Sequence, residues 1–153
     1  MPDHQSLKQR LYQTCLNAIE KHINAIEQNL ASIEESRNNE TKSSAGDKYE
    51  TGRAMMQMEE EKCRAQLFQK LQLKNELAKI DLQKSYTKIE TGSLVFTNLG
   101  TYFMAIGMGK IPLDGQVYFC ISLDAPIGQQ LKNKSVGEEV TFNNKQLIIK
   151  EIH

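Results

Sequence analysis

Apolar residues recur along the first part of the chain at the spacing of a long amphipathic helix. Between about residues 5 and 37 they are separated alternately by four and three positions, with polar residues between them. The series comprises Tyr12, Leu16, Ile19, Ile23, Ile26, Leu30 and Ile33. No Gly or Pro interrupts it, and Ser6 is a suitable N-cap. The pattern predicts one continuous helix with a single apolar seam.

A second helical pattern runs from about residue 47 to 84. It follows a polar stretch at 38–46 that contains no apolar residue larger than Ala. Its seam is less regular and comprises Tyr49, Met56, Cys63, Leu67, Leu71, Leu77 and Ile80. Two amphipathic helices joined by a short polar turn favour an antiparallel coiled-coil hairpin with a tip near 38–50. Pairing of these helices between two chains, as a dimeric coiled coil, is the alternative.

The periodicity changes at Thr91 and Gly92, after which short β-rich runs follow. Five strands are predicted, at 93–98, 101–108, 116–123, 139–142 and 146–152. The turn signals Asn-Leu-Gly, Pro-Leu-Asp-Gly and Asn-Asn separate them. One short helix is predicted at 125–134, because Pro126 suits a helix start and apolar residues follow at a spacing of four.

These elements define the expected fold class and domains. We expect an α+β protein whose helical hairpin occupies residues 1–86. A small antiparallel sheet with one short helix is expected to occupy residues 87–153.

The composition narrows the class of protein. Of 153 residues 25% are charged, and 19 Lys and Arg balance 19 Asp and Glu, so no basic field exists to hold nucleic acid. We expect a soluble cytoplasmic protein without membrane association, because the chain shows no signal-peptide pattern and no apolar run of membrane-spanning length. Cys15, Cys63 and Cys120 lie among apolar neighbours and are expected to be buried free thiols.

Motifs of common enzyme chemistry are absent from the sequence. It contains no GxSxG, GxxxxGKS/T, GxGxxG or CxxC motif. The histidines His4, His22 and His153 show no spacing that indicates a catalytic set or a metal site of the chain's own. The sequence therefore indicates none of these enzyme classes and no intrinsic cofactor.

The expected hairpin tip is acidic. Between Glu34 and Glu61 lie eight acidic and four basic residues, a net charge of −4 within a neutral chain. The simplest interpretation is a solvated helix end, in which Asp47 and Glu50 complement the helix dipole. The functional alternative is that these carboxylates complete a half-filled Mg²⁺ site in a partner, since Mg²⁺ usually takes only one or two protein carboxylates.

Two segments carry a resemblance to a known family. ISLDAPIGQQLKNKSVGEEVTF (121–142), followed by LIIKEI (147–152), resembles the signature S-x-x-S-P-(I/M)-x-x-x-L-x-x-K-x-x-G-(D/E)-x-V of the GreA/GreB family of bacterial transcript cleavage factors. The matching positions are Ser122, Pro126, Leu131, Lys134, Gly137, Glu138 and Val140, while Ala125 replaces the usual Ser. SSAGDKYETGRA (43–54) is similar to the family's S-E-N-A-E-Y-x-x-A tip segment, anchored on Tyr49.

The resemblance implies a monomeric regulator of transcription elongation that binds RNA polymerase. It implies an FKBP-like C-terminal domain that docks through the loop of Asp124, Ala125, Pro126 and Ile127. The hairpin would enter the secondary channel of the polymerase and approach the RNA 3′ end. Acidic residues at its tip would share a Mg²⁺ ion with the polymerase, whose own active site hydrolyses backtracked RNA.

The tip departs from the family pattern, which leaves two modes of action open. Lys42 and Ala45 occupy the family's acidic positions, and Glu40, Asp47 and Glu50 are the candidate Mg²⁺ ligands nearby. The alternatives are stimulation of cleavage and occupation of the channel without cleavage.

Two other classes of function are weighed against polymerase binding. One is a coiled-coil interaction protein unrelated to polymerase. The other is a peptidyl-prolyl isomerase, which needs a deep aromatic pocket. The aromatic residues of the second half are expected mainly in the core and comprise Phe96, Tyr102, Phe103, Tyr118, Phe119 and Phe142.

Overall fold

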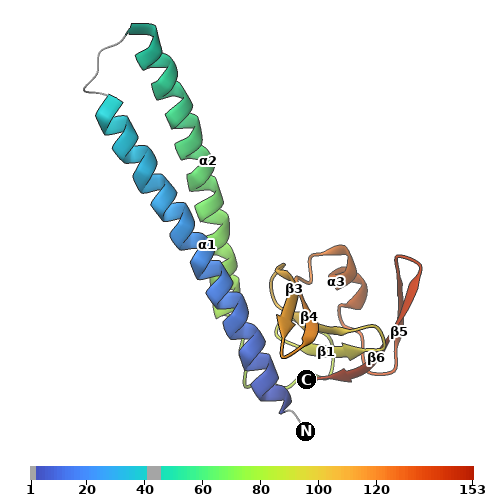
Figure 1. Cartoon of the computed structure of the whole chain (residues 1–153). Coiled ribbons are helices and arrows are strands. Elements are labelled where there is room, and N and C mark those ends of the chain that lie inside the picture. The colour runs from blue at the N-terminus through green and yellow to red at the C-terminus, as the bar shows by residue number, and fades with distance from the viewer. Residues whose placement is uncertain (1–2, 41–45) are drawn as a thin grey trace. The chain divides into compact units, whose positions relative to one another are not determined.

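The computed structural model describes residues 3–40 and 46–153, with side chains described for 3–39 and 51–153 (Figure 1). Its two long helices are α1 (His4–Glu40) and α2 (Gly46–Ala78). They are followed by β1 (Leu94–Thr97), β2 (Thr101–Met104), β3 (Gly109–Leu113), β4 (Gln116–Ile121), α3 (Pro126–Leu131), β5 (Glu139–Phe142) and β6 (Lys145–Ile152). The chain therefore has the expected α+β composition. No helix in the described ranges combines the length and apolar character that crossing a membrane requires.

The described chain packs as two compact units. One is Ala18–Lys74, and the other is the chain up to Asn17 together with Asn75–His153. The change in periodicity at Thr91 and Gly92 therefore marks a change of secondary structure. Packing instead groups the start of α1 and the end of α2 with the sheet, because these helix ends carry apolar residues that the sheet unit buries.

In the Ala18–Lys74 unit, α1 and α2 run antiparallel and contact each other through polar pairs. Lys74 Nζ lies 3.5 Å from a Glu20 carboxylate oxygen, and the Asn29 side-chain amide donates a hydrogen bond to Cys63 Sγ at 3.5 Å. The helical hairpin predicted from the sequence is confirmed.

The apolar seam of this hairpin is only partly buried. Ile23, Ile33 and Cys63 are buried, whereas Leu71 is 43% exposed and Phe68 is 62% exposed. Two helices alone have no third element to cover the outer side of their apolar stripe, so part of it stays in contact with water.

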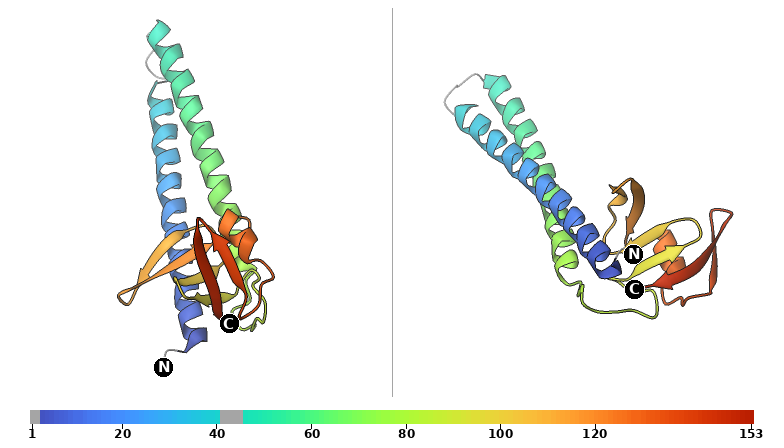
Figure 2. Two further views of the ribbon diagram at one scale, coloured as in Figure 1. Left: turned by 90° about the vertical axis from the view of Figure 1, so that its right-hand side faces the viewer. Right: turned by 60° about the horizontal axis from the view of Figure 1, so that its bottom comes forward.

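The six strands form one sheet in the order β3-β4-β2-β1-β6-β5. Four neighbouring pairs are antiparallel, but β2 and β4 are parallel, so the sheet is mixed and not wholly antiparallel as expected. The parallel pair arises because the chain leaves β2, crosses to the edge as β3 and returns in a tight hairpin as β4 (Figure 2).

The additional strand, β3, lies between the predicted strands 101–108 and 116–123, where the sequence pattern predicts only the Pro-Leu-Asp-Gly turn. β2 ends at Met104, and β3 begins at Gly109 with Ile111 as its only buried residue. Gly109 and Pro112 weaken the strand signal in the sequence. Pro112 is tolerated because β3 is an edge strand, where a missing backbone N–H need not remove a ladder hydrogen bond.

Two predicted turn signals are confirmed as tight β-hairpin turns. Asp114 and Gly115 join β3 to β4 with φ angles of 51° and 77°. Asn143 and Asn144 join β5 to β6 with φ angles of 53° and 63°. Positive φ at both central residues is the hallmark of a type I′ turn, which Asp, Asn and Gly adopt most readily.

The second helix is shorter than its sequence pattern indicates. It was expected to reach residue 84 but ends at Ala78, because the following segment carries Tyr86 and Ile89 into the core of the sheet unit. Ile89 N–H donates to Lys134 O at 3.0 Å, and Asn133 N–H donates to Ile89 O at 2.9 Å. A helix continued to residue 84 could not make these backbone contacts.

The start of α1 is buried along a stripe that differs from the predicted seam. Leu7, Leu11 and Cys15 are buried at a spacing of four, whereas Tyr12 and Leu16 are half-buried. Here the helix packs within the sheet unit. A single apolar seam cannot indicate which side faces a helix and which faces a sheet.

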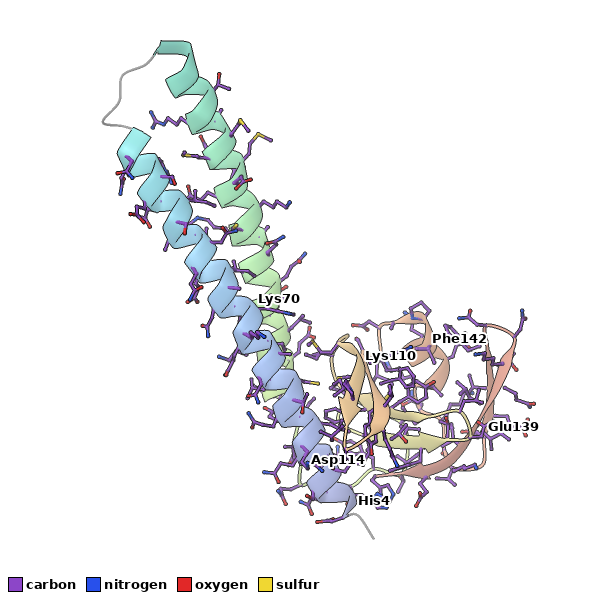
Figure 3. The ribbon with its side chains drawn as sticks, in the orientation of Figure 1. His4, Lys70, Lys110, Asp114, Glu139 and Phe142 are labelled. Atoms are coloured by element: carbon purple, nitrogen blue, oxygen red, sulfur yellow. The ribbon has the colours of Figure 1, made fainter. Side chains whose placement is uncertain are left out.

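Side chains of α1 contact the β3–β4 hairpin directly. Cys15 Sγ lies 3.1 Å from Cys120 Sγ of β4, and Arg10 forms an ion pair with Asp114 at the hairpin turn (Figure 3). The hydrogen bond with Cys120, together with burial, raises the pKa of the Cys15 thiol. All three cysteines are buried free thiols, as the sequence predicted.

The helix start itself is capped three positions earlier than expected. Asp3 precedes α1, its carboxylate accepts the Gln5 backbone N–H at 3.1 Å, and its backbone oxygen accepts the Leu7 N–H at 2.9 Å. Asp3 therefore takes the capping role that the sequence pattern assigned to Ser6.

Candidate partner-binding site

The loop of residues 124–127, expected as the docking loop, connects β4 to α3. Asp124 and Pro126 are exposed, whereas Ala125 and Ile127 are half-buried. Ser122 holds the backbone in place: its hydroxyl accepts the Asp124 N–H at 3.1 Å, and its carbonyl accepts the Ala125 N–H at 3.1 Å. The structure therefore has an acidic residue and a proline at the surface of an ordered turn.

Gly128 explains why this loop lies so close to α3. It is buried, and a Cβ at this position would overlap the carbonyl oxygen of Ser122 and come within 2.7 Å of Leu123 Cα. Only glycine allows this approach of two backbone segments. Sequence reasoning missed Gly128 because it falls on a variable position of the family signature, and its role depends on a tertiary contact.

An apolar pocket of about 400 Å³ adjoins the loop and shares Ile127 with it. Its lining residues are Leu99, Tyr102, Phe119, Ile121, Ile127, Phe142, Asn143, Lys145 and Leu147. The Tyr102 and Phe119 rings stack with centroids 5.2 Å apart, and Phe142 comes from the end of β5 (Figure 3). These three aromatic residues were expected mainly in the core, but they also form the wall of this pocket.

Most other positions of the family-like signature have structural roles. Leu131 and Val140 are buried in the core of the sheet unit. Gly137 has a φ of 92°, and the Glu138 carboxylate accepts the Ser135 backbone N–H at 2.6 Å. Their side chains or backbones maintain the fold, whereas Asp124 and Pro126 of the 124–127 loop are exposed.

The candidate Mg²⁺ ligands at the hairpin tip are Glu40, Asp47 and Glu50, and their side chains lie outside the described residues. Glu40 is the last residue of α1, and Asp47 and Glu50 belong to the first turns of α2. Lys42 and Ala45 also lie outside the described residues. The proposed metal role of the tip therefore stays a prediction.

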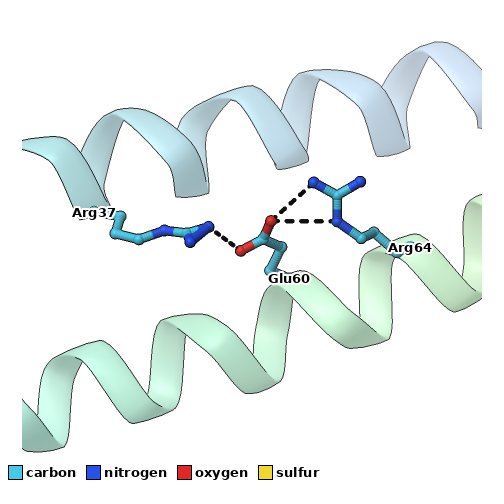
Figure 4. Close-up of polar contacts among 3 residues, drawn as sticks. All are labelled: Arg37, Glu60 and Arg64. Atoms are coloured by element: carbon cyan, nitrogen blue, oxygen red, sulfur yellow. Dashed lines mark hydrogen bonds and ion pairs between the residues drawn. The ribbon is translucent and has the colours of Figure 1, made fainter.

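Glu60, an acidic residue of the same region, is paired with two arginines (Figure 4). Its carboxylate accepts hydrogen bonds from Arg64 Nη2 at 2.9 Å and Arg64 Nε at 3.2 Å, and it forms an ion pair with Arg37 of α1. The hydrogen bond with Arg64 contributes most to lowering the pKa of Glu60 below its usual value. Glu60, one of the eight acidic residues counted in the sequence, therefore helps to hold the two helices together.

Comparison with known proteins gives little further guidance. No family model matches the chain, and no curated protein matches it. Among solved structures, the chain is similar to the crystal structure of GreA factor homolog 1 (Gfh1) of Thermus thermophilus, with 15% sequence identity and a TM-score of 0.35. The alignment covers 90% of this chain and 94% of that chain. A likeness this distant carries no argument about function, which must be proposed from the residues themselves.

Gly128→Ala is expected to destabilise the sheet unit by about 1–3 kcal/mol, because the added methyl group overlaps the Ser122 carbonyl. Urea unfolding followed by circular dichroism measures this change in the free energy of unfolding. Gly107→Ala is the matched control, since a Cβ there meets nothing within 4 Å. Equal stability of the two variants would contradict the close approach described for Gly128.

Glu60→Gln is expected to lower the melting temperature at neutral pH but not in acid. The folded-state pKa of Glu60 lies below the ordinary value of 4.5, so its contribution is present above pH 4.5 and is lost as pH falls through the lowered pKa. Thermal melts between about pH 7 and 3 should show the difference from wild type disappearing at the acid end. Glu59→Gln, at the neighbouring exposed position, should leave the pH dependence unchanged.

Proposed function

We propose that this chain is a regulator of transcription elongation that binds RNA polymerase through its 124–127 loop. The observation that carries the proposal is the exposed Asp124 and Pro126 on a turn held rigid by Ser122 and Gly128. The resemblance of the surrounding segment to the GreA/GreB signature supports polymerase as the kind of partner. The chain would act as an accessory factor with no catalytic residues of its own.

The loop and the neighbouring pocket offer complementary kinds of contact to one partner surface. The Asp124 carboxylate can pair with a basic side chain, and Pro126 provides a rigid apolar projection. The pocket beside Ile127 can receive an apolar side chain of the partner, which is the kind of buried anchor that contributes most to binding energy. Because the turn is already ordered, binding costs little conformational entropy.

The helical hairpin would carry the regulatory chemistry. Glu40, Asp47 and Glu50 at its tip would contribute ligands to a Mg²⁺ ion shared with the polymerase near the RNA 3′ end. Hydrolysis of backtracked RNA would then be performed by the polymerase. Occupation of the channel without cleavage is the alternative mode of action.

Asp124→Arg is expected to abolish binding to bacterial RNA polymerase while leaving the fold intact, since Asp124 is exposed. The loss arises because a new positive charge faces the basic group that the carboxylate would pair with. Binding is measured by biolayer interferometry, and circular dichroism checks the fold. Glu90→Arg makes the same charge change at another exposed position of the sheet unit and should bind as wild type does.

Polymerase binding that survives Asp124→Arg would contradict the proposed docking surface. If the wild-type chain forms a dimer and does not bind polymerase, the alternative of an interaction protein acting through its helices would be supported instead.

Combined Asp47→Ala and Glu50→Ala substitutions are expected to spare polymerase binding and to remove stimulated RNA cleavage. The assay adds the purified protein to a backtracked elongation complex and follows shortening of the RNA with and without Mg²⁺. Cleavage that persists in the double variant would argue against these two carboxylates as ligands. A wild-type protein that binds but never shortens RNA would support channel occupation without cleavage.

A further inference from the structure

Residues from opposite ends of the described chain meet in the sheet unit. His4 lies at the start of α1 (Figure 3), while Glu151 is near the end of β6 and His153 directly follows that strand. One ligand atom from each of these three residues lies within 4.8 Å of the other two. No sequence pattern indicates this cluster, because the residues are brought together only by packing of α1 within the sheet unit.

Two ring nitrogens of this cluster are buried without a hydrogen-bond partner. They are His4 Nδ1 and His153 Nε2, and a Glu151 carboxylate oxygen lies 3.6 Å from the latter. Burying a polar atom without a partner is unfavourable. One cation can serve both ring nitrogens and the Glu151 carboxylate.

Aromatic contacts hold the two imidazoles together. The His4 and His153 rings stack with centroids 3.8 Å apart, and Phe96 packs edge-on against them at 5.1 and 5.7 Å. The stack therefore keeps the two imidazoles side by side, and imidazole in its neutral form binds metal ions.

We propose that His4, Glu151 and His153 bind a divalent transition-metal ion of the Zn²⁺ type. Two imidazole nitrogens and one carboxylate oxygen are a preferred donor set for Zn²⁺, whereas Mg²⁺ and Ca²⁺ prefer oxygen ligands alone. Ligand atoms of a tetrahedral zinc ion lie about 3.3 Å apart, and each imidazole nitrogen binds in the plane of its ring. The His4 and His153 rings therefore rotate out of their stack as the side chains close on the ion. Glu151 is exposed and free to make this movement.

Space for further ligands lies beside the histidines. His4 and His153 line a pocket of about 240 Å³, which Asp3 also lines. The pocket can hold a water molecule at the fourth coordination position. Lys8 lines it too, but its ammonium group donates to Lys84 O at 3.4 Å and lies 4.9 Å from the centre of the Tyr86 ring.

A bound ion would link the first turn of α1 to the end of β6. Because an ion that binds only the folded chain stabilises it, binding should raise the melting temperature of the sheet unit. This role is independent of the Mg²⁺ ion proposed for the hairpin tip, which involves other residues and another class of ligand.

The experiment is titration of the full chain, prepared without a histidine tag, with Zn²⁺ by isothermal calorimetry. We expect one ion per chain, no comparable binding of Mg²⁺, and a rise in melting temperature. His4→Ala, His153→Ala and Glu151→Gln should each weaken Zn²⁺ binding at least about tenfold and reduce that rise. His22→Ala is the matched control, because His22 is an exposed histidine of α1 in the other unit.

Substitution by Co²⁺ gives a second measurement that does not depend on stability. The intense visible absorption of four-coordinate Co²⁺ should develop with wild type and His22→Ala, and should be lost with His4→Ala. Circular dichroism of the metal-free variants checks that each is folded. Absence of tight Zn²⁺ binding by wild type, or an equal loss in His22→Ala, would overturn the proposal.

Discussion

Burial of the first turns of α1 within the sheet unit is the contact on which the rest of this structure depends. Leu11 and Cys15 are almost completely buried there, and Cys15 touches Cys120 of β4. If the start of α1 left the sheet unit, this apolar surface would be exposed to water, which is unfavourable. The helix start is therefore held firmly in place. The same packing brings His4 to the end of β6, so a single apolar stripe holds the start of α1 within the sheet unit and also assembles the histidine cluster.

The candidate docking loop owes its order to the backbone rather than to the residues that a partner would contact. Gly128 lets α3 approach Ser122, and Ser122 in turn holds the backbone of Asp124 and Ala125. Exposed side chains can then vary in chemistry without disturbing the turn. This division explains why most positions of the family-like signature maintain the fold, while the side chains of Asp124 and Pro126 are exposed.

A count of acidic and basic residues in the hairpin does not show which of these charges are paired. Glu60 belongs to the acidic region, yet it lies between Arg37 and Arg64 and helps to join α1 to α2. The exposed apolar residues of α2, such as Phe68, show that the seam alone does not shield the helices from water. Polar pairs between α1 and α2 therefore act together with the apolar seam to keep the two helices in register.

The sequence by itself determined the local structure: two long helices, the tight turns at Asp114 and Asn143, and buried thiols. These features follow from periodicity, turn propensity and hydrophobicity, which act between near neighbours. Tertiary structure alone decided that β3 forms at the edge, that α2 ends at Ala78, and that His4 meets His153. Such outcomes depend on which distant surfaces bury each other, and no local pattern records that choice.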